Sequence, residues 1–254
     1  MKPISSKKIV YEPLCIGRKT SSIVEDILRL ETEPYNYLEK LFTVIAEYYN
    51  HLVDHSQTRD ETFSALEETG RKYSHSFYSN KPNVEEIRQI LAPYENQLRR
   101  NIGQRIIIDR HISGNYVSTQ NWALNLFDWA QTKNIDTVVN IATGAFEPAC
   151  LLAEMLEVDN LQHLRYSQLK KFDSTPKIIE PKNFGKRVLV IDDFCWSGES
   201  LAIVATDVKK NSESDSEVYA TSIFKPQKGR DFAYENNLGN WKKEGLERLW
   251  RVRL

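Results

Sequence analysis

Cysteine is scarce in this chain, and no two cysteines stand close together. The 254 residues include three cysteines, Cys15, Cys150 and Cys195, with no CxxC pair. An odd number of widely separated cysteines argues against a disulfide framework and against a structural zinc site. A reducing compartment fits this composition, and we expect the protein in the cytoplasm.

The chain also lacks an excess of charge and a long apolar run. Lys and Arg number 34 and Asp and Glu 35, so the net charge of −1 creates no general field that attracts nucleic acid. No run of about 18 apolar residues occurs, so the sequence predicts no transmembrane helix and no membrane partner. Residues 1–20 carry lysines without a continuous apolar stretch, which argues against a secretory signal.

Several familiar catalytic and nucleotide-binding motifs are absent. The chain has no P-loop, GxGxxG, kinase signature or GxSxG. It does have 41% hydrophobic and 27% charged residues, the balance of an ordinary globular protein. At about 150 residues per domain, its length allows one large domain or two small ones.

Residues 20–100 have the apolar spacing of helices. Pro34 suits the first turn of a long helix, and another helix is expected over about 58–77. A further helix follows Asn83 and is interrupted by Pro93. Each helix carries one apolar stripe, so we expect the helices to bury these stripes against one another and to pack on the rest of the chain as a separate layer.

From about residue 104 onward, strands and helices alternate. Strands are expected over residues 105–108, 136–142, 164–169, 187–191 and 218–224, the last of which is the final clear strand. Such alternation, with strands that are apolar on both faces, is typical of a parallel sheet with helices on both faces. Ligands bind such sheets at the carboxyl ends of the strands. We therefore predict an α/β domain over residues 104–254 after an all-helical region over residues 1–103.

The most informative segment follows the most apolar strand. Asp192 and Asp193 end this strand, and Ser197, Gly198 and Ser200 follow in a loop that leads into a helix. Carboxylates at a strand end can accept hydrogen bonds from sugar hydroxyls. Hydroxyls, loop amides and a helix N-terminus can hold a phosphate. The segment therefore suits a phosphorylated sugar, and the alternative is a strand capped by solvated acids and a Ser/Gly turn.

This segment resembles the 5-phosphoribosyl-1-pyrophosphate (PRPP) binding motif of type I phosphoribosyltransferases. That motif is an apolar strand, two acids, three variable residues, Thr-Gly-X-Thr and a helix; here Ser replaces both Thr and keeps the hydroxyls. The resemblance implies that Asp192 and Asp193 are the catalytic acids, which orient the ribose and hold Mg²⁺ indirectly, through PRPP. It further implies that substrate is bound by Cys195, Trp196, Ser197, Gly198, Glu199 and Ser200.

A second segment resembles the pyrophosphate loop of the same family. Thr143, Gly144 and Ala145 stand between a strand and a helix, where the family has a basic or small residue and a Gly-Gly pair. The resemblance implies that they hold pyrophosphate, and the alternative is a plain strand–turn–helix connection. Lys225, before Pro226, resembles the Lys-Pro pair of the purine-using branch, in which Lys contacts the base. The alternative for Lys225 is a surface lysine.

Two positions depart from the family pattern. Trp196 stands where the 6-oxopurine enzymes carry a carboxylate that serves as general base, and an indole cannot accept a proton. Thr143 stands where a basic residue is common, which would remove one cation from the pyrophosphate site. These departures matter for the choice between two hypotheses about function.

The first hypothesis is a Mg²⁺-dependent transferase of nucleotide metabolism. It would transfer 5-phosphoribosyl from PRPP to a nucleobase or a related nitrogen nucleophile. The second is a non-catalytic protein that binds PRPP or a nucleotide and regulates a partner. The resemblance covers about residues 104–240, so the N-terminal helices lie outside it. Those helices are a candidate surface for a protein partner. A homodimer is a second possible assembly.

Overall fold

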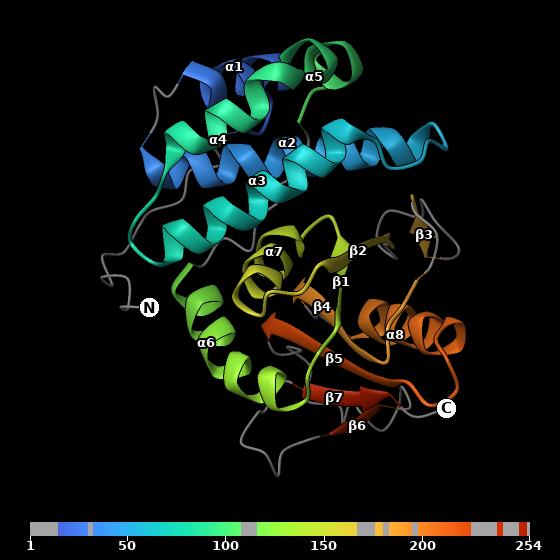
Figure 1. The fold of residues 1–254 in the computed structure, drawn as a ribbon. Helices are drawn as coiled ribbons and strands as arrows, with labels where there is room; N and C mark the ends of the chain where they lie inside the picture. The colour runs from blue at the N-terminus through green and yellow to red at the C-terminus, as the bar shows by residue number, and fades with distance from the viewer. Residues whose placement is uncertain are drawn as a thin grey trace.

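The computed structural model describes residues 15–29, 33–107, 116–166, 176–179, 183–194, 198–224, 238–240 and 249–252. A group of N-terminal helices lies beside a seven-stranded sheet that has its own covering helices (Figure 1). Within the described ranges, all strands of this sheet come after residue 136. The N-terminal helices therefore add no strand to the sheet.

The N-terminal helices begin and end close to where the sequence predicts. They are α1 (Thr20–Arg29), α2 (Pro34–Asp54), α3 (Glu61–Tyr78), α4 (Val84–Leu91), the 3-10 helix η1 (Ala92–Tyr94) and α5 (Glu95–Ile102). Pro34 lies in the first turn of α2, as predicted. Asp60 caps α3 by accepting a hydrogen bond from the backbone N of Phe63, and Asn83 caps α4 in the same way. Pro93 lies in η1, where α4 ends.

The sheet is parallel at its centre and antiparallel at both edges. Its strands are β1 (Thr137–Ala142), β2 (Asn160–Arg165), β3 (Lys177–Ile178), β4 (Arg187–Phe194), β5 (Glu217–Phe224), β6 (Leu238–Asn240) and β7 (Leu249–Val252). Their order is β3-β2-β1-β4-β5-β7-β6. β2, β1, β4 and β5 run parallel to one another, whereas β3, β7 and β6 pair antiparallel. The predicted parallel sheet is thus confirmed for its four central strands.

Some strand predictions are wrong. Residues 105–107 form only an isolated bridge with the segment before α1. β2 begins at Asn160 rather than at Leu164. The prediction starts too late because the strand buries the polar residues Gln162 and His163, which form hydrogen bonds, and an apolar pattern does not reveal such residues. β5 is not the final strand, since β7 and β6 extend the sheet beyond it.

Helices cover both faces of the sheet, as predicted. α8 (Glu199–Asn211) packs on one face, where its apolar side chains meet Val188 and Val190 of β4. α6 (Tyr116–Thr132) and α7 (Phe146–Met155) belong to the core on the other face, with Leu189 and Ile191 of the same strand. Alternate residues of a strand point to opposite faces, so β4 supplies both cores.

The N-terminal helices share a core with the α/β part. The rings of Tyr49 in α2 and Phe146 in α7 lie 5.5 Å apart, and both residues belong to one cluster of buried side chains. The apolar faces of α2 and α3 therefore cover α7 as well as each other, unlike the separate layer that the sequence predicts. The division into residues 1–103 and 104–254 stays a prediction.

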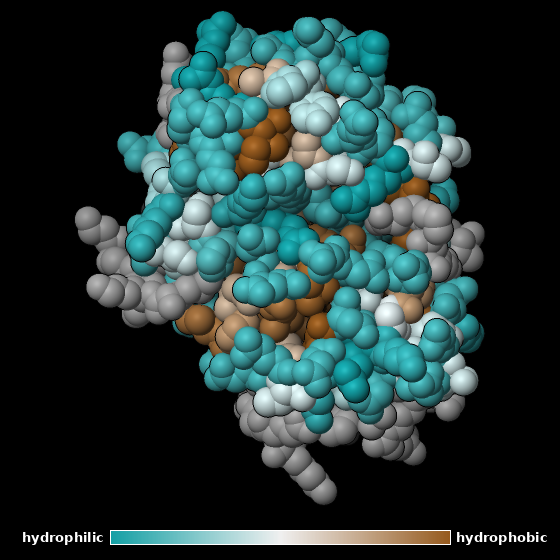
Figure 2. All heavy atoms as spheres, in the orientation of Figure 1, coloured by the Kyte–Doolittle hydropathy of each residue, from teal (hydrophilic) through white to brown (hydrophobic). Residues whose placement is uncertain are grey.

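The surface of the described residues is largely polar. Figure 2 shows one face, which is mainly hydrophilic, with hydrophobic residues gathered near the middle of the view. Ile16 and Ile106 are the exposed large hydrophobic residues of the described part, with 46% and 57% of their surface accessible. No helix in that part is both long enough and apolar enough to span a bilayer.

Candidate functional site

The two segments that carry the predicted motifs meet at one edge of the sheet. β1 and β4 are neighbours and run parallel, with Asn140 opposite Ile191. Their carboxyl ends therefore lie side by side. The chain leaves β1 at Thr143, and β4 carries Asp192 and Asp193 close to its end. This edge is where ligands bind parallel α/β sheets.

Asp193 lies directly over Gly144. A Cβ atom added to Gly144 would lie 2.4 Å from Oδ2 of Asp193 and 2.5 Å from both Cγ and Oδ1. Any larger residue would have to push the carboxylate or the turn aside, so glycine at this position lets Asp193 lie this close to the turn. The contact joins the predicted pyrophosphate turn to one of the predicted ribose-binding acids.

The turn over residues 143–145 leads from β1 into α7 at this edge. Thr143 and Gly144 are half-buried, while Ala145 is buried and precedes the first residue of α7. The peptide bond between Ala142 and Thr143 is cis. Backbone N–H groups at the start of a helix attract anions. The turn is therefore suited to a phosphate or a pyrophosphate.

Gly198 opens the second turn that suits an anion. Its φ of 78° lies in the left-handed region that glycine adopts without strain. Its carbonyl accepts a hydrogen bond of 2.9 Å from the backbone N of Ala202, which starts α8. Glu199 and Ser200 follow in the first turn, where N–H groups and the helix dipole favour a phosphate.

The two acids differ in burial and in the side of the sheet that they reach. Asp192 is 7% exposed and stands opposite Ser222 of β5, whereas Asp193 is half-buried. Because neighbouring residues in a strand point to opposite faces, Asp192 lies on the α8 face. Asp193 lies on the face of the β1 turn. Each acid therefore stands on the side of one of the two turns that are suited to an anion.

Part of the predicted site lies outside the described residues. Cys195, Trp196, Ser197 and Lys225 belong to this group, and their roles stay predictions. The described residues that the structure places at the carboxyl edge, or at the start of the helix that follows it, are Thr143, Gly144, Ala145, Asp192, Asp193, Gly198, Glu199 and Ser200.

One cation at this edge was missed by the sequence analysis. Arg165 ends β2 and stands opposite Ala142, the last residue of β1. Its Nη1 atom lies 2.7 Å from Oδ1 of Asp54, the last residue of α2, and its side chain is 14% exposed. A strand predicted to start at Leu164 places Arg165 near its amino end, whereas β2 ends at Arg165. With the bounds of β2 known, a basic residue at the carboxyl end of the strand is the signal that identifies Arg165 as a candidate site residue.

The described cysteines offer no nucleophile. Burial, together with the nearby charge of Glu67, raises the pKa of the Cys150 thiol well above its ordinary value. Burial also raises the pKa of Cys15 to about 11. A buried neutral thiol is unreactive. The chemistry of the described site therefore depends on carboxylates, hydroxyls and backbone amides.

The fold and the site define an α/β protein with two turns suited to anions and two acids at the carboxyl edge of a mostly parallel sheet. No protein-family model matches the chain, and no curated protein matches it at a significant level. The structure is similar to a purine phosphoribosyltransferase from Pyrococcus horikoshii Ot3, with 20% identity and a TM-score of 0.36, over 42% of this chain and 73% of that one.

It is also similar to the xanthine-guanine-hypoxanthine phosphoribosyltransferase of Helicobacter pylori, with 19% identity and a TM-score of 0.35. That match covers 44% of this chain and 75% of the other. Both structures carry the name of the enzyme class that the two sequence motifs resemble.

Proposed function

We propose that this protein binds PRPP and transfers its 5-phosphoribosyl group to a nucleobase or a related nitrogen nucleophile. The observation that carries the proposal is the contact between Asp193 and Gly144. It brings the acid proposed to bind ribose and the turn proposed to bind pyrophosphate together at a single edge of the sheet. Neither motif alone would specify a sugar that carries phosphates at both ends.

PRPP would lie across the carboxyl ends of β1 and β4. Asp192 and Asp193 would accept hydrogen bonds from the ribose hydroxyls. The backbone amides of residues 198–200 would hold the 5-phosphate, and those of Thr143 and Gly144 would hold the pyrophosphate, since the amide of Ala145 donates to the carbonyl of Ile141. Because each acid stands on the side of one turn, the ribose would lie between the two anion sites.

The reaction would form a bond between C1 of the ribose and a nitrogen of the acceptor. The bond between C1 and the pyrophosphate oxygen breaks, and its electron pair leaves with pyrophosphate. An N–H acceptor also loses a proton. Positive charge that develops on the sugar would be stabilised by Asp192 and Asp193, and negative charge on the leaving group by the amides of Thr143 and Gly144.

Mg²⁺ is part of the proposal, and the donor set fits it. This ion commonly binds through one or two carboxylates together with substrate phosphates. Asp192 and Asp193 supply two carboxylates, and the described residues contain no group of three or more side chains placed to hold a metal. Mg²⁺ would enter with PRPP and add positive charge to the pyrophosphate, while the acids position the ribose and hold the ion only indirectly, through PRPP.

A regulatory protein that binds PRPP or a nucleotide without turnover is the second candidate. The identity of Trp196 favours it, because an indole cannot serve as the general base of a 6-oxopurine enzyme. Turnover with an N–H acceptor would need another proton acceptor. Asp193 and Glu199 are the nearest carboxylates in the sequence.

The two candidates differ in one measurable product, pyrophosphate. We would assay its release from PRPP and Mg²⁺ over a panel of nucleobases, and measure PRPP binding by calorimetry on the same sample. Release with at least one base supports the transferase. Binding without release supports the regulatory protein, and the absence of both results contradicts the site assignment.

A further inference from the structure

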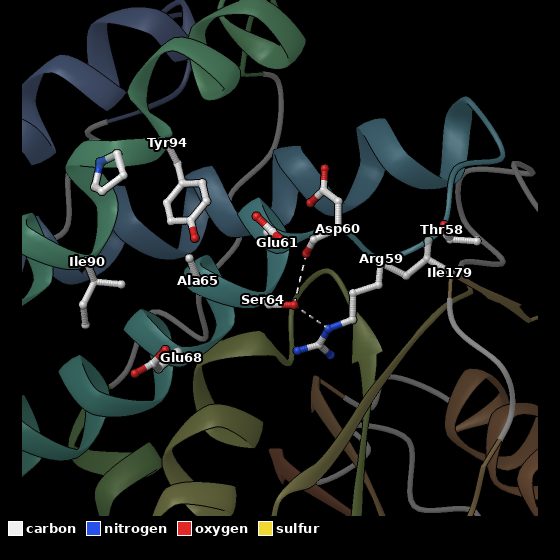
Figure 3. A pocket seen from close by; sticks show the side chains of 11 residues that line it. Thr58, Arg59, Asp60, Glu61, Ser64, Ala65, Glu68, Ile90, Tyr94 and Ile179 are labelled. Carbon is white, nitrogen blue, oxygen red and sulfur yellow. Dashed lines mark hydrogen bonds between the residues drawn. The ribbon is translucent and has the colours of Figure 1, made fainter.

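The N-terminal helices contain a groove that is separate from the site at the carboxyl edge. Its volume is about 970 Å³, and its walls come from the start of α3, the junction of α4 with η1, and Ile179 next to β3. Figure 3 shows the groove running along α3, with Glu61, Ala65 and Glu68 on that helix and Tyr94 facing them. It shares no residue with the proposed PRPP site.

One wall and the floor of the groove are apolar. Ala65 lines it from α3, and Ile90, Pro93 and the ring of Tyr94 line it from the opposite side. Ile179 closes one end, where its carbonyl accepts a hydrogen bond of 3.2 Å from the backbone of Arg59. A ligand with a hydrocarbon portion could therefore bury that portion along α3.

The groove carries acidic groups at separate points along its length. Glu61 and Glu68 are exposed and stand seven residues apart on α3, which is about 10.5 Å along a helix axis. Asp60 uses its carboxylate within the protein, since it accepts hydrogen bonds from Tyr48 and from the backbone of Phe63. Two carboxylates at this separation are too far apart to share one small ion.

Arg59, the arginine among the residues that line the groove, does not neutralise the charges of Glu61 and Glu68. The guanidinium of Arg59 donates to both carboxylate oxygens of Glu67, at 3.1 and 2.8 Å, and to Oγ of Ser64 at 3.0 Å. Its charge is therefore matched by Glu67, a buried residue outside the lining. Glu68 has one ion pair, with Lys72 on the same helix at 2.8 Å.

We propose that this groove binds a linear organic dication of the polyamine class. One ammonium group would lie at Glu61 and the other at Glu68, and the methylene chain would pack on Ala65 and Ile90. The ring of Tyr94 would add a cation–π contact. An inorganic cation would leave the apolar wall unused, whereas a neutral apolar molecule would leave Glu61 without a counter-charge and Glu68 with only its partly exposed pair to Lys72.

The test is calorimetric titration of the full chain, without PRPP, with 1,8-diaminooctane, 1,2-diaminoethane and Mg²⁺. The long diamine spans both carboxylates and the short one does not, so we expect the long one to bind about tenfold more tightly. Glu61→Gln combined with Glu68→Gln should remove most of this preference. Tyr94→Leu should weaken binding of the long diamine and leave the fold unchanged.

The matched control is Glu85→Gln combined with Glu213→Gln, two exposed acids outside the groove. It removes the same charge and should change the affinity by about twofold or less. Equal affinity for both diamines, equal weakening in the control, or no binding of the long diamine overturns the proposal. Circular dichroism confirms that each variant is folded. Because PRPP is not used, failure here leaves the proposed transferase function unaffected.

Discussion

The Nε2 atom of His163 in β2 lies 2.5 Å from Oε2 of Glu67 in α3, and both side chains are buried. Arg59 donates two further hydrogen bonds to Glu67. His163 stands opposite Asn140 of β1, the strand that ends at the predicted pyrophosphate turn. This buried hydrogen bond therefore ties the N-terminal helices to the part of the sheet that leads to the candidate site.

Glu67→Gln should destabilise the protein strongly. Removing one partner of a buried ion pair leaves the other charge without compensation, so we expect the free energy of unfolding to fall by about 3 kcal/mol. Urea denaturation measures the change. The control is Glu68→Gln, because Glu68 is the exposed neighbour on the same helix, and its loss should cost less than about 0.5 kcal/mol. Equal losses would contradict the role given to the buried pair.

The contribution of Glu67 should disappear at low pH. Burial opposes ionisation, but the hydrogen bonds and charges of His163 and Arg59 outweigh it and lower the pKa of Glu67. A carboxyl with a lowered pKa stabilises the fold above its unfolded pKa and loses this effect as the pH falls through its folded pKa. The stability difference between wild type and Glu67→Gln should shrink below about pH 4.3. A difference that persists unchanged to about pH 2 would contradict this.

A chain that begins at Asn101 should not fold as a stable α/β protein. Loss of α1–α5 would expose Phe146 and the rest of the apolar surface of α7 that α2 and α3 cover. We expect a loss of the cooperative urea transition and of the near-ultraviolet circular dichroism signal. A cooperative transition with α/β circular dichroism would show instead that residues 104–254 fold independently.

The central fold could be predicted because its signals are local. Pro34, Asp60 and Asn83 mark helix starts, and β4 is a nearly continuous apolar run. The start of β2 is not evident from the sequence, because His163 is buried through a hydrogen bond with Glu67 of α3, which lies far away in the chain. Hydrophobic periodicity contains no information about such long-range partners.

In the candidate site, too, local features could be predicted from the sequence and long-range contacts could not. Motif spacing predicts the position of both candidate anion-binding turns, and the preference for glycine at position 198 follows from its positive φ. The close approach of Asp193 to Gly144 could not be predicted, since it depends on β1 and β4 being neighbours in the sheet. Arg165 was missed because its place at the carboxyl edge depends on where β2 ends.

Gly144→Ala should weaken PRPP binding. The added methyl group would meet the carboxylate of Asp193, so either the acid or the turn must move. We expect calorimetry to show at least about tenfold weaker binding of PRPP with Mg²⁺, since small displacements at a binding turn are costly. Asp193→Ala in the same background relieves the clash and should not restore binding. Unchanged affinity in Gly144→Ala would contradict the described contact.

Trp196→Asp should distinguish the two candidate functions. The change supplies the carboxylate that 6-oxopurine enzymes carry at the matching position, so a transferase should keep or gain pyrophosphate release. In a regulatory protein, the same change should weaken PRPP binding and produce no release. Both quantities are measured on this one variant. Wild-type release with a free base that is lost in Trp196→Asp would contradict both readings.

The central claim is that Asp192 and Asp193 form the sugar-binding part of a PRPP site, and PRPP binding by the double variant Asp192→Asn with Asp193→Asn tests it most directly. The substitutions keep the shape of both side chains, so circular dichroism should be unchanged. Asp207→Asn with Asp215→Asn removes the same charge elsewhere and is the control. The account predicts that calorimetry with Mg²⁺ detects PRPP binding to the wild type and the control and none to the double variant. Unchanged PRPP affinity in a folded double variant would contradict it.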